Sequence, residues 1–156
     1  MSLFPFTRKR DGVHASFGQH ERQLLDQLLG QLAGLLDEPD QADPAVARLL
    51  PPGYSGDAEA EAEFRRLTVD DLAARKVESA RVARESLAGD LSKPLSAQTA
   101  QAWLLTLTDL RLTLGARLGV TAEGFPDGAD REARLMHDVY DWLGFVQETL
   151  VRALDR

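Results

Sequence analysis

Apolar residues recur every three to four positions along most of the chain, which is the pattern of amphipathic helices. Pro44 and Gly119 mark a helix start and a helix end, because proline suits the first turn and glycine suits the residue after the last. Thr68 can cap a helix start, so we place a break there. The pattern predicts helices over residues 19–37, 44–50, 57–67, 69–88, 96–118 and 130–154.

The first seventeen residues have a different pattern, with two short extended stretches on either side of Asp11-Gly12. This dipeptide favours a tight hairpin turn, because both turn positions need positive φ. A hairpin is stable only when it packs on other elements, and Phe4, Phe6 and Phe17 can supply that packing. We therefore expect residues 1–17 to form a small β-hairpin on a helical body.

The segment 96–118 differs from the other helices because it is apolar on two sides. One side carries Trp103, Leu107, Leu110, Leu114 and Leu118, and the other carries Leu105, Leu112 and Ala116. A helix that is apolar on both sides must be covered on both sides. The sequence predicts a mainly α fold, in which an orthogonal or bundle-like helical domain of residues 1–156 surrounds this central buried helix.

Three charged residues, Asp109, Arg111 and Arg117, lie within this otherwise apolar helix. Charge inside a core is costly unless it is paired. The structural interpretation is a set of ion pairs between helices, for which the candidate partners are Glu63, Arg65, Arg66 and Asp141. The functional interpretation is a charged spot at the edge of a groove that receives a partner helix.

The overall charge restricts the class of partner. The formal net charge is −7, whereas binding to nucleic acid by electrostatics draws on clustered Lys and Arg. Acidic and basic stretches alternate along the chain, which suits a protein partner better than bare DNA.

No apolar run reaches the roughly 18 to 20 residues of a membrane span, and no secretory signal is recognisable. We expect a cytoplasmic protein that does not contact a membrane.

No residue pattern indicates catalysis. His137, Asp138 and Asp141 are the best metal candidates, because positions i and i+4 of a helix share a face, but a closed site needs more ligands. The favoured interpretation is that they are solvated polar positions on an amphipathic helix, because polar residues commonly fill the outward face. Phosphate-binding and dinucleotide-binding glycine motifs and a nucleophile elbow are lacking. We therefore predict no enzyme, no cofactor and no metal, and the absence of cysteine excludes thiol chemistry in this chain.

Three stretches resemble the actinobacterial oxidative stress regulator (AosR) family, formerly a domain of unknown function: EAEAEFRRLTVDDLAARK, WLLTLTDLRLTLGARLGVT and VYDWLGFVQETLV. The resemblance covers nearly the whole chain. It implies a dimeric, transcription-associated regulator that acts with an alternative sigma factor on genes of cysteine and mycothiol supply. A characterised member senses oxidation through a CxxxC cysteine pair. Redox sensing by that pair does not carry over to this chain, which has no cysteine.

The leading hypothesis is a non-catalytic regulator that binds a sigma factor or an RNA polymerase component as a homodimer. The predicted contact residues are Phe64, Arg65 and Arg66, followed by Arg111 and Arg117. The alternatives are a general protein-binding adaptor or scaffold, and a metal-dependent enzyme that uses His137 and Asp141. Direct DNA binding is a further alternative, and the acidic charge predicts that it is weak and salt-dependent in the absence of a partner.

Overall fold

The computed structural model describes residues 4–40, 42–51, 58–119 and 130–155, with side chains over the same ranges except 58–67. Within these ranges two strands are followed by five helices, which confirms the predicted mainly α fold with an N-terminal hairpin. The elements are β1 (Phe6–Lys9), β2 (Gly12–Ala15), α1 (Gln19–Asp37), α2 (Pro44–Leu49), α3 (Ala58–Ala88), α4 (Ala97–Leu118) and α5 (Arg131–Leu154).

The hairpin turn lies one residue earlier than the sequence suggested. Lys9 pairs with Gly12 across the antiparallel strands, so the connecting residues are Arg10 and Asp11 rather than Asp11 and Gly12. In this turn only Gly12 has positive φ, at 137°. Asp11 keeps an ordinary backbone conformation, and its carboxylate lies 2.7 Å from Nε2 of His14. Neither connecting residue therefore has positive φ, and glycine is needed only at the first residue of β2.

Side chains cap three of the helices, as expected for Ser and Asp at a helix start. Asp43, Ser96 and Asp130 accept hydrogen bonds from backbone amides of α2, α4 and α5 respectively. Gly119 ends α4 in the left-handed conformation, with φ of 71°. These local signals fix where the three helices begin and where α4 ends.

Helix α3 is continuous from Ala58 to Ala88, so the predicted break at Thr68 is wrong. The segment contains neither proline nor glycine, which are the residues that interrupt a helix strongly. A single threonine lowers helix propensity by less than about 0.7 kcal/mol, which the neighbouring turns outweigh. A residue that can cap a helix does not by itself end the helix that precedes it.

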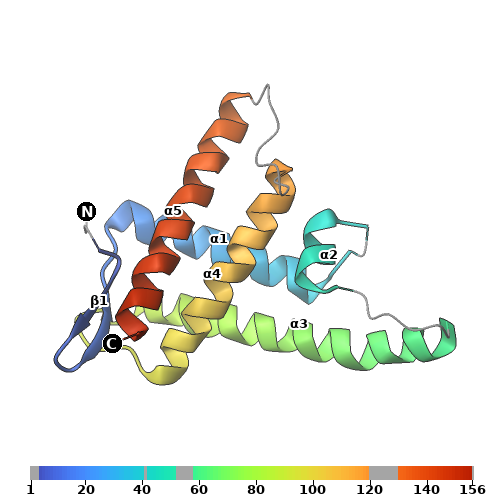
Figure 1. Cartoon of the computed structure of the whole chain (residues 1–156), viewed down its shortest axis with the longest axis horizontal. Helices are drawn as coiled ribbons and strands as arrows, with labels where there is room; N and C mark the ends of the chain where they lie inside the picture. The colour runs from blue at the N-terminus through green and yellow to red at the C-terminus, as the bar shows by residue number, and fades with distance from the viewer. Residues whose placement is uncertain (1–3, 41, 52–57, 120–129, 156) are drawn as a thin grey trace.

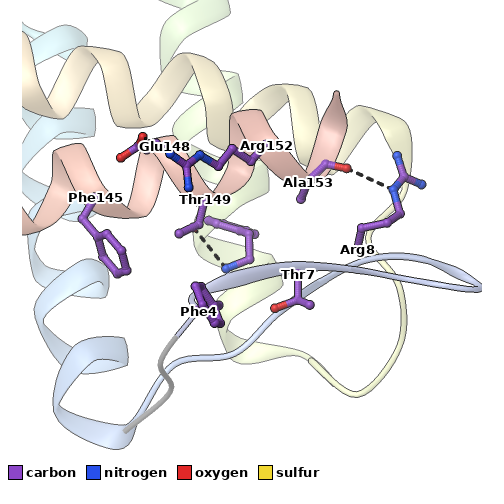
Figure 2. A pocket seen from close by; sticks show the side chains of 9 residues that line it. Phe4, Thr7, Arg8, Phe145, Glu148, Thr149, Arg152 and Ala153 are labelled. Atoms are coloured by element: carbon purple, nitrogen blue, oxygen red, sulfur yellow. Dashed lines mark hydrogen bonds and ion pairs between the residues drawn. The ribbon is translucent and has the colours of Figure 1, made fainter. Parts of the chain in front are cut away.

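The helices form two antiparallel pairs that cross steeply, α1 with α3 and α4 with α5 (Figure 1). Helix α4 also contacts α1, α2 and α3, which confirms its central position. The hairpin lies beside the C-terminal end of α5 (Figure 1). There the amide of Phe6 donates to Oγ1 of Thr149 at 3.3 Å, and Nε of Arg8 donates to the carbonyl of Ala153 at 3.0 Å (Figure 2).

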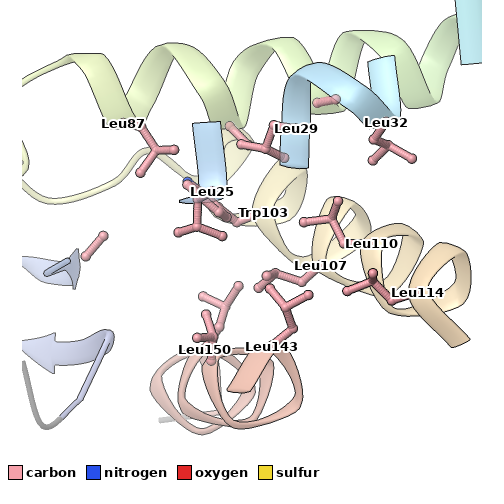
Figure 3. Close-up of a cluster of buried hydrophobic side chains, with 14 of the residues drawn as sticks. Leu25, Leu29, Leu32, Leu87, Trp103, Leu107, Leu110, Leu114, Leu143 and Leu150 are labelled. Carbon is pink, nitrogen blue, oxygen red and sulfur yellow. The ribbon is translucent and has the colours of Figure 1, made fainter. Parts of the chain in front are cut away.

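The core forms where the two helix pairs cross. Leucines of α1, α4 and α5 surround Trp103, whose side chain is fully buried (Figure 3). The ring of Trp103 contacts Phe6 and Phe17, with centroids 5.7 Å away in each case, so the hairpin is tied to the central helix. Its indole Nε1 donates to Oγ of Ser86 at 2.8 Å. This hydrogen bond satisfies a buried donor that would otherwise be costly.

The second apolar side of α4 is covered less completely than the sequence predicted. Leu112 and Ala116 are half-buried, but Leu105 is 55 % exposed. The neighbouring helices cover the two sides of α4 unequally, and the spacing of apolar residues does not reveal this difference. Leu105 is therefore a surface leucine and not part of the core.

Candidate protein-docking surface

Asp109 faces α3 and is 4 % exposed. Nζ of Lys76 lies 2.7 Å from its Oδ1, and the Lys76 side chain is 20 % exposed. Burial raises the pKa of the Asp109 carboxyl above its ordinary value, and the hydrogen bond from Lys76 counteracts part of that rise. This ion pair therefore belongs to the packing between α3 and α4.

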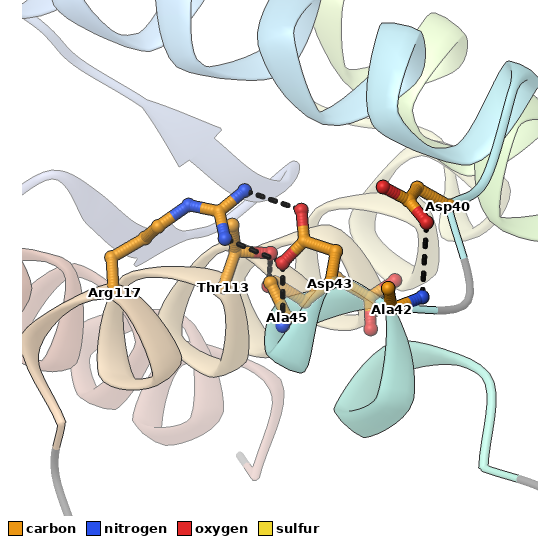
Figure 4. Close-up of polar contacts among 7 residues, drawn as sticks. Asp40, Ala42, Asp43, Ala45, Thr113 and Arg117 are labelled. Carbon is orange, nitrogen blue, oxygen red and sulfur yellow. Dashed lines mark hydrogen bonds and ion pairs between the residues drawn. The ribbon is translucent and has the colours of Figure 1, made fainter.

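Arg117 reaches from the last turn of α4 to Asp43, the N-cap of α2 (Figure 4). Its two terminal nitrogens donate to the two carboxylate oxygens at 2.5 and 2.8 Å, which is the bidentate geometry of strong arginine–carboxylate pairs. Asp43 also accepts from the amide of Ala45 at 2.9 Å. The Arg117 guanidinium, followed by this amide, lowers the pKa of Asp43 to about 2. Arg117 therefore joins two helices.

Arg111 points to α5. Its Nη1 donates to Oε1 of Gln147 at 3.1 Å, and its guanidinium carbon lies 5.1 Å from the centre of the Tyr140 ring. This distance is within the range of a cation–π contact. Arg111 is thus held by a neutral amide and an aromatic face.

The partners expected for these charges are not the ones that the described residues provide. Asp141 lies 3.3 Å from His137 of its own helix, and no ion pair between Asp141 and α4 is found within the described residues. The side chains of Glu63, Phe64, Arg65 and Arg66 lie outside the described residues, so their predicted roles stay predictions.

The partners that the structure provides were not identified from the sequence. Lys76, Asp43 and Gln147 lie 33, 74 and 36 residues from the residues they bind. Asp43 precedes Pro44, a position typical of a helix cap, and Lys76 follows Arg75 in a locally basic stretch, but neither feature indicates a partner in another helix. The one local signal for Gln147 is its polarity within an apolar stretch of α5.

A groove of about 200 Å³ lies between α1, α4 and α5. The lining of this groove is mostly apolar. Its apolar residues are Leu28, Leu32, Leu35, Leu110, Leu114 and Met136, and its polar residues are Gln31, Thr113 and Arg117. Leu28 and Leu35 are seven residues apart on α1 and only half-buried. An apolar groove with a polar edge is the kind of surface that receives an amphipathic helix.

A cleft of about 240 Å³ lies between β1 and α5 (Figure 2). Phe4 and Phe145 line it and are 58 % and 43 % exposed. Its α5 wall also carries Glu148 and Arg152, whose charged groups lie 2.8 Å apart. The groove between α1, α4 and α5 has a more continuous apolar lining, so it is the better match to a partner helix.

The metal candidates do not form a ligand cluster. Nε2 of His137 faces Oδ2 of Asp141 at 3.3 Å, and across the described ranges no three His, Asp or Glu residues are grouped to hold an ion. Over the same ranges no helix combines the length and apolar character that crossing a membrane requires.

The comparisons with known proteins agree with the family resemblance. Residues 4–154 match the family described as Domain of unknown function (DUF2017). An AosR protein of Mycobacterium leprae is 31% identical to this chain, and the match covers 86% of this chain and 79% of the M. leprae protein. The "Oxidative stress regulator AosR" of Mycobacterium tuberculosis is 28% identical over 93% of this chain and 84% of its own length. No solved structure matches. The chain therefore belongs to the DUF2017 family, and its mycobacterial relatives are named oxidative stress regulators.

Proposed function

We propose that this protein is a non-catalytic stress regulator that binds a component of the transcription apparatus, a sigma factor or RNA polymerase, as a homodimer. The observation that carries the proposal is the similarity to named regulators over 93% of the chain. The chain has no cysteine, so the regulation does not use a thiol of this chain as its sensor.

The groove between α1, α4 and α5 supports a helix-in-groove mode of binding. Leu28 and Leu35 lie along one edge, and Met136 lies on α5. Methionine adapts its shape to a partner, which suits a binding surface. A partner helix with apolar residues at positions i, i+3 or i+4, and i+7 would place them along this lining.

The test is affinity capture from a native extract, followed by binding of the purified prey by calorimetry. We expect capture of a sigma factor or RNA polymerase by the wild type and weakened binding by Leu28→Gln. Leu105→Gln is the matched control, because Leu105 is an exposed leucine that does not line the groove. Alanine variants of Phe64, Arg65 and Arg66 test the contact residues that the sequence suggested.

The outcomes separate the candidate functions. Repeated recovery of neither transcription component would count against the proposal, and specific recovery of an unrelated protein would favour the adaptor function. If Leu28→Gln and Leu105→Gln weaken binding equally, the partner does not bind specifically in the groove. Sedimentation analysis of the wild type tests the homodimer, which predicts twice the chain mass.

A further inference from the structure

Arg111 is held in one orientation by residues of α5. Its guanidinium lies close to Gly144, where an added Cβ would be 3.5 Å from the guanidinium carbon. The Tyr140 ring is 5.1 Å away, one turn earlier on α5, and Gln147 accepts the hydrogen bond from Nη1. Arg111 is therefore positioned before any ligand arrives.

The orientation of Gln147 is itself fixed. Its Nε2 donates to Oγ1 of Thr108 at 2.6 Å, and the Thr108 hydroxyl donates to the carbonyl of Leu104 at 3.1 Å. The amide oxygen of Gln147 is then directed to Arg111, because the nitrogen is already used. This chain of hydrogen bonds supplies Arg111 with an acceptor that has no charge.

Among the described residues, none neutralises the charge of Arg111. Arginine is always protonated in proteins. Arg75, Arg81, Arg84, Arg117 and Arg152 each pair with a carboxylate. For Arg111, no carboxylate lies within ion-pair distance among the residues that the structure describes, and its buried Nε has no hydrogen-bond partner there. A half-buried cation in this state is costly, because a buried charged donor without an acceptor has lost its contact with water.

The Arg111 side chain lines a pocket of about 160 Å³ between α2, α4 and α5. The lining consists of Arg48, Thr108, Arg111, Leu112, Gly115 and Tyr140. Among the described residues, this lining includes two arginines and no acidic side chain, although the whole chain has a net charge of −7. At 3.6 residues per turn, these α4 residues lie on the face opposite Leu110, Leu114 and Arg117 of the groove.

We propose that this pocket binds a phosphate monoester. The Arg111 guanidinium supplies positive charge for such a phosphate, which carries about −1.5 to −2 at neutral pH, and Arg48 brings further N–H groups to the same lining. Arginine binds phosphate oxygens through pairs of parallel hydrogen bonds. The pocket volume of about 160 Å³ suits one phosphate group that carries only a small substituent. The inference goes beyond the proposed function, because it concerns an anion and not a partner helix, and it uses a different face of α4.

The test is titration of the purified wild-type chain with inorganic phosphate, followed by chemical shifts of backbone and arginine side-chain N–H groups. Sodium chloride at equal ionic strength and sodium acetate are the comparison salts. We expect saturable shifts at Arg111 and Gln147 with phosphate only. Arg111→Gln should weaken binding about tenfold or more, the loss expected for a charge-assisted hydrogen bond. Arg84→Gln is the matched control, since Arg84 is exposed and pairs with Asp26.

Gln147→Glu tests the central argument without removing the arginine. Its carboxylate would pair with Arg111 internally, so phosphate binding should fall while the fold, measured by circular dichroism, is retained. Saturable binding that Arg111→Gln leaves unchanged, equal binding of acetate, or no saturable shift with phosphate would each overturn the proposal. Titration with free phosphoserine and with a phosphoserine peptide then shows whether the phosphate belongs to a small molecule or to a protein side chain.

Discussion

The ion pair between Lys76 and Asp109 allows a quantitative test of how α3 and α4 are held together. Lys76→Met would leave the Asp109 carboxylate 4 % exposed and without its cation. Breaking a buried pair in this way costs about 3–5 kcal/mol when both partners are fully buried. Because a fifth of the Lys76 side chain is exposed, we expect a loss of about 2–4 kcal/mol in the free energy of unfolding at pH 7.

The double variant Lys76→Met/Asp109→Leu removes both charges and should recover most of this loss. Replacing a buried pair with apolar residues is often neutral or stabilising, so we expect a stability within about 1 kcal/mol of the wild type. The assay is urea unfolding followed by the fluorescence of Trp103 and Trp142. Arg75→Met is the control, since its pair with Asp71 is exposed and should contribute less than about 1 kcal/mol.

The pH dependence of Lys76→Met follows from the pKa of Asp109. Burial already raises this pKa, and removing Lys76 also removes the interactions that lower it. An acid whose pKa is higher in the folded state contributes stability at low pH, and that stability is lost as the pH rises through the folded pKa. Lys76→Met should therefore regain stability, relative to the wild type, as the pH falls from neutral. Equal destabilisation of the single and double variants would refute this account of the pair.

Three further changes test separate parts of the fold. Ser86→Ala removes the acceptor for the Trp103 indole and should cost about 1–3 kcal/mol in urea unfolding, because a buried donor loses its partner. Gly12→Ala should lower the thermal midpoint, with a strain of about 1–2 kcal/mol from placing a Cβ at positive φ. Asp43→Asn should be less stable than the wild type above pH 3.8, the ordinary pKa, and the difference should vanish as the pH falls through about 2 in an acid titration followed by circular dichroism.

The sequence indicated the helical elements well where the signals were local. The apolar spacing of the helices, the proline at the start of α2 and the glycine after α4 depend on residues within a few positions of each other. The same local reasoning misplaced the hairpin turn by one residue and divided α3 at Thr68. Both errors came from a residue that permits a feature without requiring it.

Contacts between distant segments could not be read in the same way. The two apolar sides of α4 predicted its central place, because apolar surface on opposite sides needs two layers of cover. The sequence did not show that Leu105 would stay exposed, nor that Asp109, Arg111 and Arg117 would meet Lys76, Gln147 and Asp43. Each of these contacts depends on the crossing of the helix pairs.

Periodicity and residue type were enough to predict the helical class, the hairpin, the central helix and the lack of thiol chemistry, since these properties depend on local residue patterns and composition. The packing of the helices determined which charged residues pair, and therefore which arginine has no carboxylate partner among the described residues. The physical reason is that ion pairs and grooves form between side chains within a few ångströms in space, and sequence separation does not determine that distance.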